Sequence, residues 1–267
     1  MLQSGACANC DRAIAGPDQK FCPTCGQTTP AHRIDWHFLG HELEHSVLHM
    51  DRGIFYSLKE LMLRPGHLMR DYIEGRRANQ VKPMLLLMIS AALVVLLGKF
   101  LLGGDLIGPS LQAGAGYVEG SSVGVEGGAA AAASAKTAVA VKDWINAHLA
   151  AFTLLLLPFQ AGAFWLAFKG RGLNYPEWLV ISAFLTVQTF IFMAAAVLVQ
   201  RWLPSAQMWV VPFAFFYLVF SLVQYFQSSS RWKTALRALL GFILFTVVSS
   251  LISAAAGFVL VSMSMHG

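Results

Sequence analysis

Four cysteines near the N-terminus have the spacing of a metal site. They form two Cys-x-x-Cys pairs with eleven residues between the pairs, at Cys7, Cys10, Cys22 and Cys25. Two such pairs on facing turns supply four thiolates to a tetrahedral Zn²⁺ ion, as in zinc ribbons and zinc knuckles. Four thiolates fill every coordination position, so we predict a structural zinc ion and no catalysis at this metal.

The residues around these cysteines favour zinc over the other uses of paired cysteines. A segment of residues 1–30 is too short to bury a core, so the metal would supply most of its folding energy. Two disulfides or a thioredoxin-like redox pair are the alternatives, but residues 1–30 contain no apolar secretion signal and no βαβ pattern. Gly26 permits the left-handed turn that such pairs use. Arg12 and Lys20 are the only cations between the first and last cysteine, so we expect no nucleic-acid partner.

A second set of residues with metal-ligand spacing follows. Histidines recur every four residues, at His37, His41, His45 and His49. Residues 41–45 read HELEH and match the HExxH motif, in which His41 and His45 would bind Zn²⁺ and Glu42 would activate water. A third ligand would come from Asp51, Glu60 or Glu74. The other interpretations are a polar flank of an amphipathic helix and a non-catalytic metal or pH-sensing role.

The histidines belong to the stretch Asp35–Pro83, which carries 14 of the 33 charged residues and is therefore not a membrane span. From Trp36 to Leu61 its apolar residues recur at steps of three and four, which is one stripe of an α-helix. Asp35 suits the N-cap of this helix, and Gly53 interrupts the stripe.

Arg64, Pro65 and Gly66 end this helical pattern, and a second short helix is predicted from about His67 to Glu74. We expect residues 31–82 to form amphipathic juxtamembrane helices, which lie on the lipid headgroups or pack against the ends of the spans.

The second part of the chain has the composition of an integral membrane protein, and apolar residues make up 56% of the whole chain against 12% charged. The predicted fold class is an all-α membrane helix bundle of about five spans, with the zinc ribbon (1–30) and the juxtamembrane helices (31–82) preceding the bundle (83–267). A flexible loop rich in Gly and Ala is predicted at 103–143. The five apolar runs lie near 83–102, 147–168, 178–199, 208–226 and 238–263.

Basic residues are unequally divided between the two sides of the predicted bundle. Three lie on one side, at Lys136, Lys142 and Arg201, and ten lie on the other, at Arg64, Arg70, Arg76, Arg77, Lys82, Lys169, Arg171, Arg231, Lys233 and Arg237. The positive-inside rule then predicts a multi-pass protein with a cytoplasmic N-terminus, and with the loop 103–143 and the C-terminus on the opposite side of the membrane.

The predicted spans contain few polar residues and no charge at mid-depth, which argues against a proton pump or an ion-coupled transporter. We expect the span amides and hydroxyls to join helices to one another, at Gln160, Thr186, Gln188, Thr189 and Gln224. Glu177 opens the third span. It is predicted either to cap that helix or to pair with an arginine or histidine of residues 35–82.

Several segments together resemble a known family. They are the pair FCPTCGQ, HRI at 32–34, HELEH, MDRG at 50–53, SLKELMLRPG at 57–66, and DYIEGRR followed by Pro83. In these segments the chain resembles a bacterial membrane-protein family catalogued as domain of unknown function 3667. LNYPEWLV is similar to a second stretch of that family, in which a histidine often follows the glutamate, whereas here Trp178 does. The resemblance implies a ribbon and several spans in a bacterial inner membrane, which would make the loop 103–143 and the C-terminus periplasmic. It brings no assigned activity.

Three functions are compatible with these features. The first is a non-enzymatic scaffold or accessory factor in the lipid bilayer, which docks a cytoplasmic or membrane protein partner. The second is a transporter component for an apolar or amphiphilic molecule. The third is a membrane metalloenzyme that uses His41, Glu42 and His45. The lack of mid-membrane charges and of a large catalytic domain favours the first.

Overall fold

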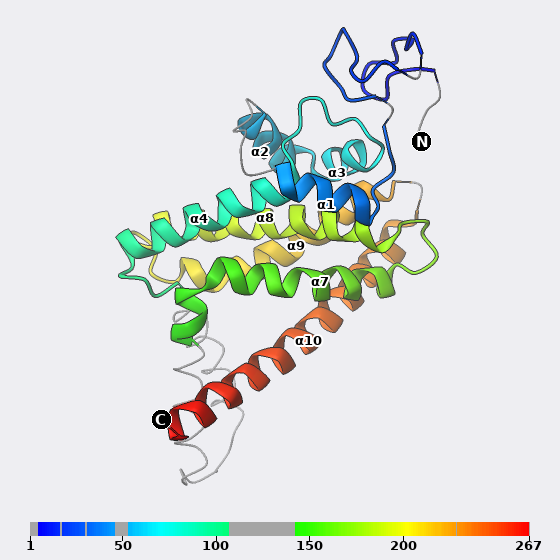
Figure 1. Ribbon diagram of the computed structural model, residues 1–267. Helices are drawn as coiled ribbons and strands as arrows, with labels where there is room; N and C mark the ends of the chain where they lie inside the picture. The colour runs from blue at the N-terminus through cyan, green and yellow to red at the C-terminus, as the bar shows by residue number, and fades with distance from the viewer. Residues whose placement is uncertain are drawn as a thin grey trace.

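In the computed structural model, the described elements that follow the cysteine segment at the N-terminus are all helices (Figure 1). It describes residues 5–16, 18–29, 31–45, 53–106, 142–227 and 229–266, without the side chains of 41–45, 150 and 257–266. Within the described residues the predicted all-α class is confirmed. The predicted loop 103–143 lies mostly outside them.

α8 (Tyr175–Val199) is the central helix of the bundle and packs against α4, α7 and α9. In the most apolar stretch of 18 residues in α8, 72% of the residues are buried, compared with 11% in the corresponding stretch of α10. A helix that is apolar on all sides is stable only inside a larger structure, and the buried side chains of Trp178, Ile181, Phe184 and Leu185 show that α8 occupies that position.

Within the described part of the chain, a search by length and hydropathy finds four helices that could cross a bilayer. They are α4 (Pro83–Leu101), α8, the continuous pair η1 (Ala206–Trp209) and α9 (Val210–Tyr225), and α10 (Arg231–His266). α7 (Leu149–Ala167) is the fifth apolar helix, and its segment Ala151–Ala167 is shorter than these four. Each predicted span therefore corresponds to an apolar helix, and the whole of α7, with 19 residues, is as long as α4.

Two helices begin earlier than their apolar runs predicted. α8 begins at Tyr175 instead of 178, and α10 begins at Arg231 instead of 238. For α8 the physical reason is the capping box of Asn174 and Glu177, because a capped first turn with an acidic side chain at the positive end of the helix dipole can extend a helix beyond its apolar part.

The bundle has two ends, which we name from the cysteine segment. α4, α8 and α10 begin at the end nearer that segment, and α7 and α9 finish there (Figure 1). We call this end the ribbon end, and the opposite end the far end.

Three short helices precede the bundle: α1 (Trp36–His45), α2 (Ile54–Leu63) and α3 (Pro65–Ile73). We call these helices, together with residues 31–35 and 74–82, the collar. The predicted N-cap is confirmed, because the backbone N–H of Phe38 donates to Asp35 Oδ1 at 2.8 Å. α2 ends where predicted, but α3 begins at Pro65 and not at His67, since proline fits the first position of a helix.

The collar packs against the bundle through buried residues. Leu61, Met69 and Tyr72 are almost completely buried, and the ring of Tyr72 meets that of Phe184 edge-on at 5.6 Å. At Gly66 an added Cβ would lie 2.4 Å from the backbone nitrogen of Tyr225, so α3 touches the backbone of α9. At these residues the collar packs against the helices of the bundle, which is one of the two arrangements predicted for residues 31–82.

Candidate metal centre and its attachment to the bundle

The two cysteine pairs lie on two turns of the same shape. In the first turn, the N–H of Cys7 donates to Arg12 O at 2.8 Å and Cys7 O accepts from the N–H of Asp11 at 2.9 Å. In the second, Cys22 makes the matching bonds with Gln27 and Gly26 at 2.8 and 2.9 Å. An antiparallel bridge flanks each turn, Ala6 with Ala13 and Phe21 with Thr28.

Both turns contain a residue with left-handed backbone. Gly26 has a φ of 72°, as predicted, and Asp11 takes the equivalent position in the first turn with a φ of 57°. Aspartate tolerates this conformation better than most residues other than glycine, because its short side chain can hydrogen-bond locally. The sequence had indicated this turn only for the second pair.

The two turns bring four sulfur atoms together. All four Sγ atoms lie within 4.8 Å of one another, and Cys7–Cys25 and Cys10–Cys22 are each separated by 3.6 Å. A disulfide needs about 2.05 Å, and the four cysteines are free thiols. Ligands at about 2.3 Å from a tetrahedral zinc ion stand roughly 3.8 Å apart. The cluster could therefore hold a metal ion such as zinc.

The electrostatics of the cluster also fit a cation. Backbone N–H groups of Cys25 and Thr24 bond to the sulfur of Cys22 and lower the pKa of its thiol to about 6. The backbone N–H of Arg12 lowers the pKa of Cys10, but desolvation and the three neighbouring sulfurs raise it to about 12. Four sulfurs this close cannot all become thiolates without a positive charge between them, and a divalent cation would supply that charge.

Gln27 attaches the cysteine segment to the collar. This residue lies two positions after Cys25 and is buried, and its Oε1 accepts the backbone N–H of Arg77 at 3.0 Å. Arg77 in turn donates to Tyr72 O at 2.8 Å, and its guanidinium lies 4.4 Å from the ring centre of Phe38. The second cysteine turn is thus bonded directly to the residues that follow α3.

Arg33 attaches the chain after the cysteines to the central helix. Its Nε and Nη2 donate to the two carboxylate oxygens of Glu177 at 2.6 and 2.9 Å, and Nη2 also donates to Gly172 O at 2.7 Å. Glu177 is only 2% exposed. The hydrogen bonds to this carboxylate raise the pKa of Arg33, although desolvation opposes the shift. Paired N–H donors matched to both carboxylate oxygens make this a geometrically specific ion pair.

Glu177 fulfils both of its predicted roles. Its N–H donates to Asn174 Oδ1 at 2.8 Å and its carboxylate accepts the N–H of Asn174 at 2.8 Å, which forms a capping box at the start of α8. The predicted pairing with a cation also occurs, but its partner is Arg33, just before the stretch 35–82 in which we expected it. Asn174 adds a further link by donating to Ile34 O at 2.9 Å.

The collar is attached to α9 in a third place. Arg70 donates to the last carbonyls of that helix, Gln224 O at 2.9 Å and Tyr225 O, where a cation also offsets the helix dipole. The N–H of Gly66 donates to Gln224 Oε1 at 2.8 Å. Arg33, Arg70 and Arg77 were not recognised as joining residues from sequence, because their partners are distant in the chain.

Polar side chains inside the bundle bond to one another, as predicted for several of them. Gln188 and Ser221 join α8 to α9 at 3.1 Å, and Thr186 donates to Gln160 Oε1 at 2.9 Å between α8 and α7. The hydroxyl of Tyr217 donates to Met62 O, at the end of α2. Through these bonds the amides of Gln160 and Gln188 have partners within the protein.

The HExxH prediction stays a prediction. His41, Glu42 and His45 lie in α1, but their side chains are outside the described residues, as are His49 and Asp51. His37 is exposed. The other two proposed ligands are in ion pairs, Glu60 with Arg64 at 2.7 Å and Glu74 with Arg76.

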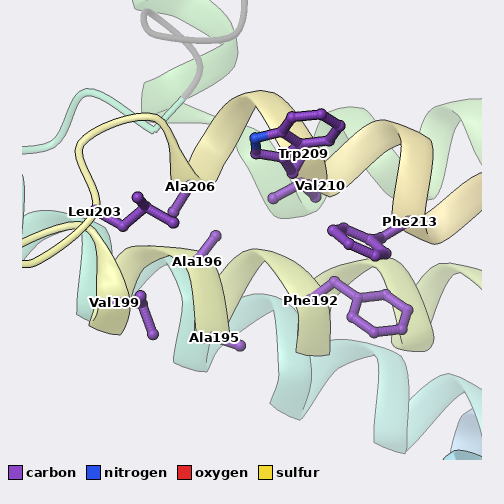
Figure 2. A pocket seen from close by; sticks show the side chains of 9 residues that line it. All are labelled: Phe192, Ala195, Ala196, Val199, Leu203, Ala206, Trp209, Val210 and Phe213. Atoms are coloured by element: carbon purple, nitrogen blue, oxygen red, sulfur yellow. The ribbon is translucent and has the colours of Figure 1, made fainter.

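One cavity lies at the far end, between the last turns of α8 and the start of η1 and α9 (Figure 2). It has a volume of about 240 Å³, and its lining is almost entirely apolar. It is lined by Phe192, Ala195, Ala196, Val199, Leu203, Ala206, Trp209, Val210 and Phe213.

Residues 51–95 match the model of a family described as a protein of unknown function (DUF3667). The matched region contains α2, α3 and the first part of α4, and it confirms the resemblance found from the sequence motifs. A search of curated proteins and a search of solved structures found no match.

Proposed function

We propose that this protein is a membrane-embedded platform that presents a zinc-stabilised ribbon to a protein partner and catalyses no reaction itself. The observation that carries the proposal is the double attachment of the ribbon. Gln27 is bonded to the collar at Arg77, and Arg33 is bonded to α8 at Glu177. A surface fixed in this way loses little conformational freedom when a partner binds, which favours affinity.

The ion in this proposal is a structural Zn²⁺ bound by all four thiolates, at Cys7, Cys10, Cys22 and Cys25. The sulfur separations of 3.6 Å support this assignment. Complete coordination by protein leaves no open position for a substrate, so the ion would hold the fold and do no chemistry. The corresponding domains are the ribbon (1–30), the collar region (31–82) and the transmembrane bundle (83–267).

We place the ribbon end in the cytoplasm of a bacterial cell and the C-terminus in the periplasm. Support comes from the ten basic residues on the ribbon side against three on the other. The clustering of the four sulfurs agrees with this placement, since the cytoplasm keeps cysteines reduced and available to a metal. In this orientation the bundle anchors the platform in the inner membrane.

The ribbon offers an exposed aromatic side chain to a partner. Phe21 precedes Cys22 and is 59% exposed, although it lies on a segment that is otherwise polar. Aromatic residues are enriched among the anchors of protein interfaces. Phe21 is therefore the residue of the ribbon at which we expect the partner to make contact.

Photo-crosslinking in living cells tests this function. A photoreactive phenylalanine analogue at position 21 should give an adduct with one discrete protein, identifiable by mass spectrometry. The matched control is position 100, because Phe100 is 81% exposed but lies near the far end of α4. The adduct should be absent at position 100 and lost when Cys22→Ser is added.

Two outcomes would reject the platform. The first is that position 21 gives no protein adduct in cells. The second is that the same adduct persists in the Cys22→Ser protein, because a partner that binds the folded ribbon cannot recognise a chain without its metal.

A further inference from the structure

Arg237, in the second turn of α10, has a charged side chain that pairs with none of the described residues. Its Nη1 atom is buried and makes no hydrogen bond to any described residue. Buried donors in native proteins almost always have an acceptor, and a charged donor without one is especially unfavourable. The atom is closed off inside the protein, so an acceptor from outside could reach only the remaining N–H groups of this half-buried side chain, which are bonded to no described residue.

The neighbouring residues of α10 show where this arginine lies. Thr234 and Ala238 are buried, and Gly241, one turn beyond Arg237, packs against α7. At Gly241 an added Cβ would lie 2.6 Å from the ring of Phe164. Residues four apart share a helix face, so Arg237 emerges along the contact between α10 and α7.

No carboxylate is available from the helices that pack there. α10 packs mainly against α7 and α9, and these three helices contain neither aspartate nor glutamate. Glu177 is the last acidic side chain of the sequence and is already paired with Arg33. The described helices around Arg237 therefore offer it no carboxylate, which leaves the position open to an anion from another molecule.

The position of Arg237 along α10 suggests what that molecule is. The residue lies six positions after Arg231, or roughly 9 Å along the axis from the ribbon end. Trp232 and Leu236 are strongly exposed on the same two turns, as expected for a helix that faces lipid near the headgroups. Lys233 is also exposed and lies one turn before Arg237, so two cations are adjacent on this surface.

We propose that Arg237 and Lys233 bind the phosphate group of a membrane phospholipid, with a preference for an anionic headgroup. The phosphate oxygens would accept charge-assisted hydrogen bonds from the guanidinium and the ammonium, and the acyl chains would follow the exposed apolar face of α10. The site rests on the membrane placement of the bundle in the proposed function, and it does not depend on a partner of the ribbon.

Native mass spectrometry of the delipidated full-length protein in detergent tests the site. Phosphatidylglycerol should bind the wild-type protein about tenfold more tightly than the Arg237→Gln protein, since a charge-assisted bond is lost. Lys233→Gln should weaken binding by about threefold, because this cation is more exposed. Arg237→Lys, which retains the charge, should recover part of the affinity, and phosphatidylcholine should bind more weakly than phosphatidylglycerol.

The matched control is Arg231→Gln, which removes an exposed cation from a different face of the same helix. An equal loss of affinity in Arg231→Gln and Arg237→Gln would overturn the proposal in favour of general attraction by charge. Unchanged phosphatidylglycerol binding in Arg237→Gln would also overturn it. If millimolar inorganic phosphate displaces the lipid, the site binds free phosphate, and the assignment to a phospholipid is overturned. Crosslinking from position 21 in the Arg237→Gln protein reports separately on the platform, so the two ideas can fail independently.

Discussion

The ribbon and the bundle are stabilised by different physical means. Among the described residues between 5 and 29, only Cys7, Ala8 and Cys22 are buried hydrophobic residues, and the two turns converge on four sulfur atoms. The bundle instead surrounds α8 with apolar side chains and contains side-chain hydrogen bonds between helices. The metal should therefore determine the folding of the ribbon alone. The joining residues, such as Arg33, should determine how firmly the ribbon is attached to the bundle.

The largest effect is expected from Cys22→Ser. Loss of one thiolate from a four-thiolate site should abolish stable zinc binding and unfold the ribbon, because little else stabilises it. Metal analysis of the purified protein should fall from one zinc per chain to none. Circular dichroism should show the helical signal of the bundle unchanged. A large loss of helix would show that the two parts are not stabilised independently.

A large effect on the contact between the collar and the bundle is expected from Gly66→Ala. The added Cβ would lie 2.4 Å from Tyr225 N and 2.5 Å from Gln224 C, which are backbone atoms that cannot move aside easily. We expect a loss of about 3 kcal/mol in the free energy of unfolding, with the zinc retained. Thermal unfolding in detergent, read by circular dichroism, measures it.

Gly40→Ala is the matched control for that substitution, since an added Cβ at Gly40 meets nothing within 4 Å. In α1 the alanine should be neutral or slightly stabilising, by about 0.5–1 kcal/mol. If both alanine variants behave alike, close contact between α3 and α9 does not stabilise the collar.

Glu177→Gln should loosen the connection between ribbon and bundle without unfolding either. Glutamine can still accept the N–H of Asn174 and preserve the cap, whereas the charge that binds Arg33 is removed. Because the Arg33 side chain is 52% exposed, it can return to water, so the expected loss is about 2 kcal/mol. Limited proteolysis should cut near residues 29–33 faster while zinc remains bound.

The surface pair Glu60–Arg64 provides the control for the ion pair. It lies within a helical turn of the collar and does not connect ribbon and bundle. Glu60→Gln should therefore leave cleavage near residues 29–33 at the wild-type rate. An equal increase in both variants would mean that Arg33 and Glu177 do not specifically hold the ribbon.

The smallest effect is expected from Gln188→Leu, within the bundle. It removes the bonds at 3.1 and 3.2 Å between Gln188 and Ser221. Hydrogen bonds between membrane helices contribute on average about 0.6 kcal/mol. A decrease of that size in stability against denaturant, with zinc content unchanged, is the predicted result. A loss above about 2 kcal/mol would contradict the average worth of such bonds.

Local features could be predicted from the sequence because neighbouring residues determine them. The cysteine spacing indicated the sulfur cluster, the apolar runs indicated the helices, and Asp35 and Glu177 were identified as helix caps. In each case the partners lie within a few residues of one another or repeat with a fixed period. Such patterns can be recognised without knowledge of the tertiary structure.

The connections between ribbon, collar and bundle could not be predicted in this way. Arg33 and Glu177 are 144 positions apart, and Arg70 and Gln224 are 154 apart. Which surface arginine reaches a given carboxylate or helix end depends on how the helices pack, and no sequence period records that. Arg33 was also overlooked because it precedes residues 35–82, the charged stretch in which the partner of Glu177 was expected.

Hydrogen exchange of the full-length protein with and without a zinc chelator tests the central claim most directly. We predict that removal of the metal abolishes the protection of backbone amides in residues 5–29 while α8 keeps its protection. Amides of the ribbon that remain protected without metal, or a loss of protection that extends through α8, would contradict a ribbon folded by its metal and attached to an independently stable bundle.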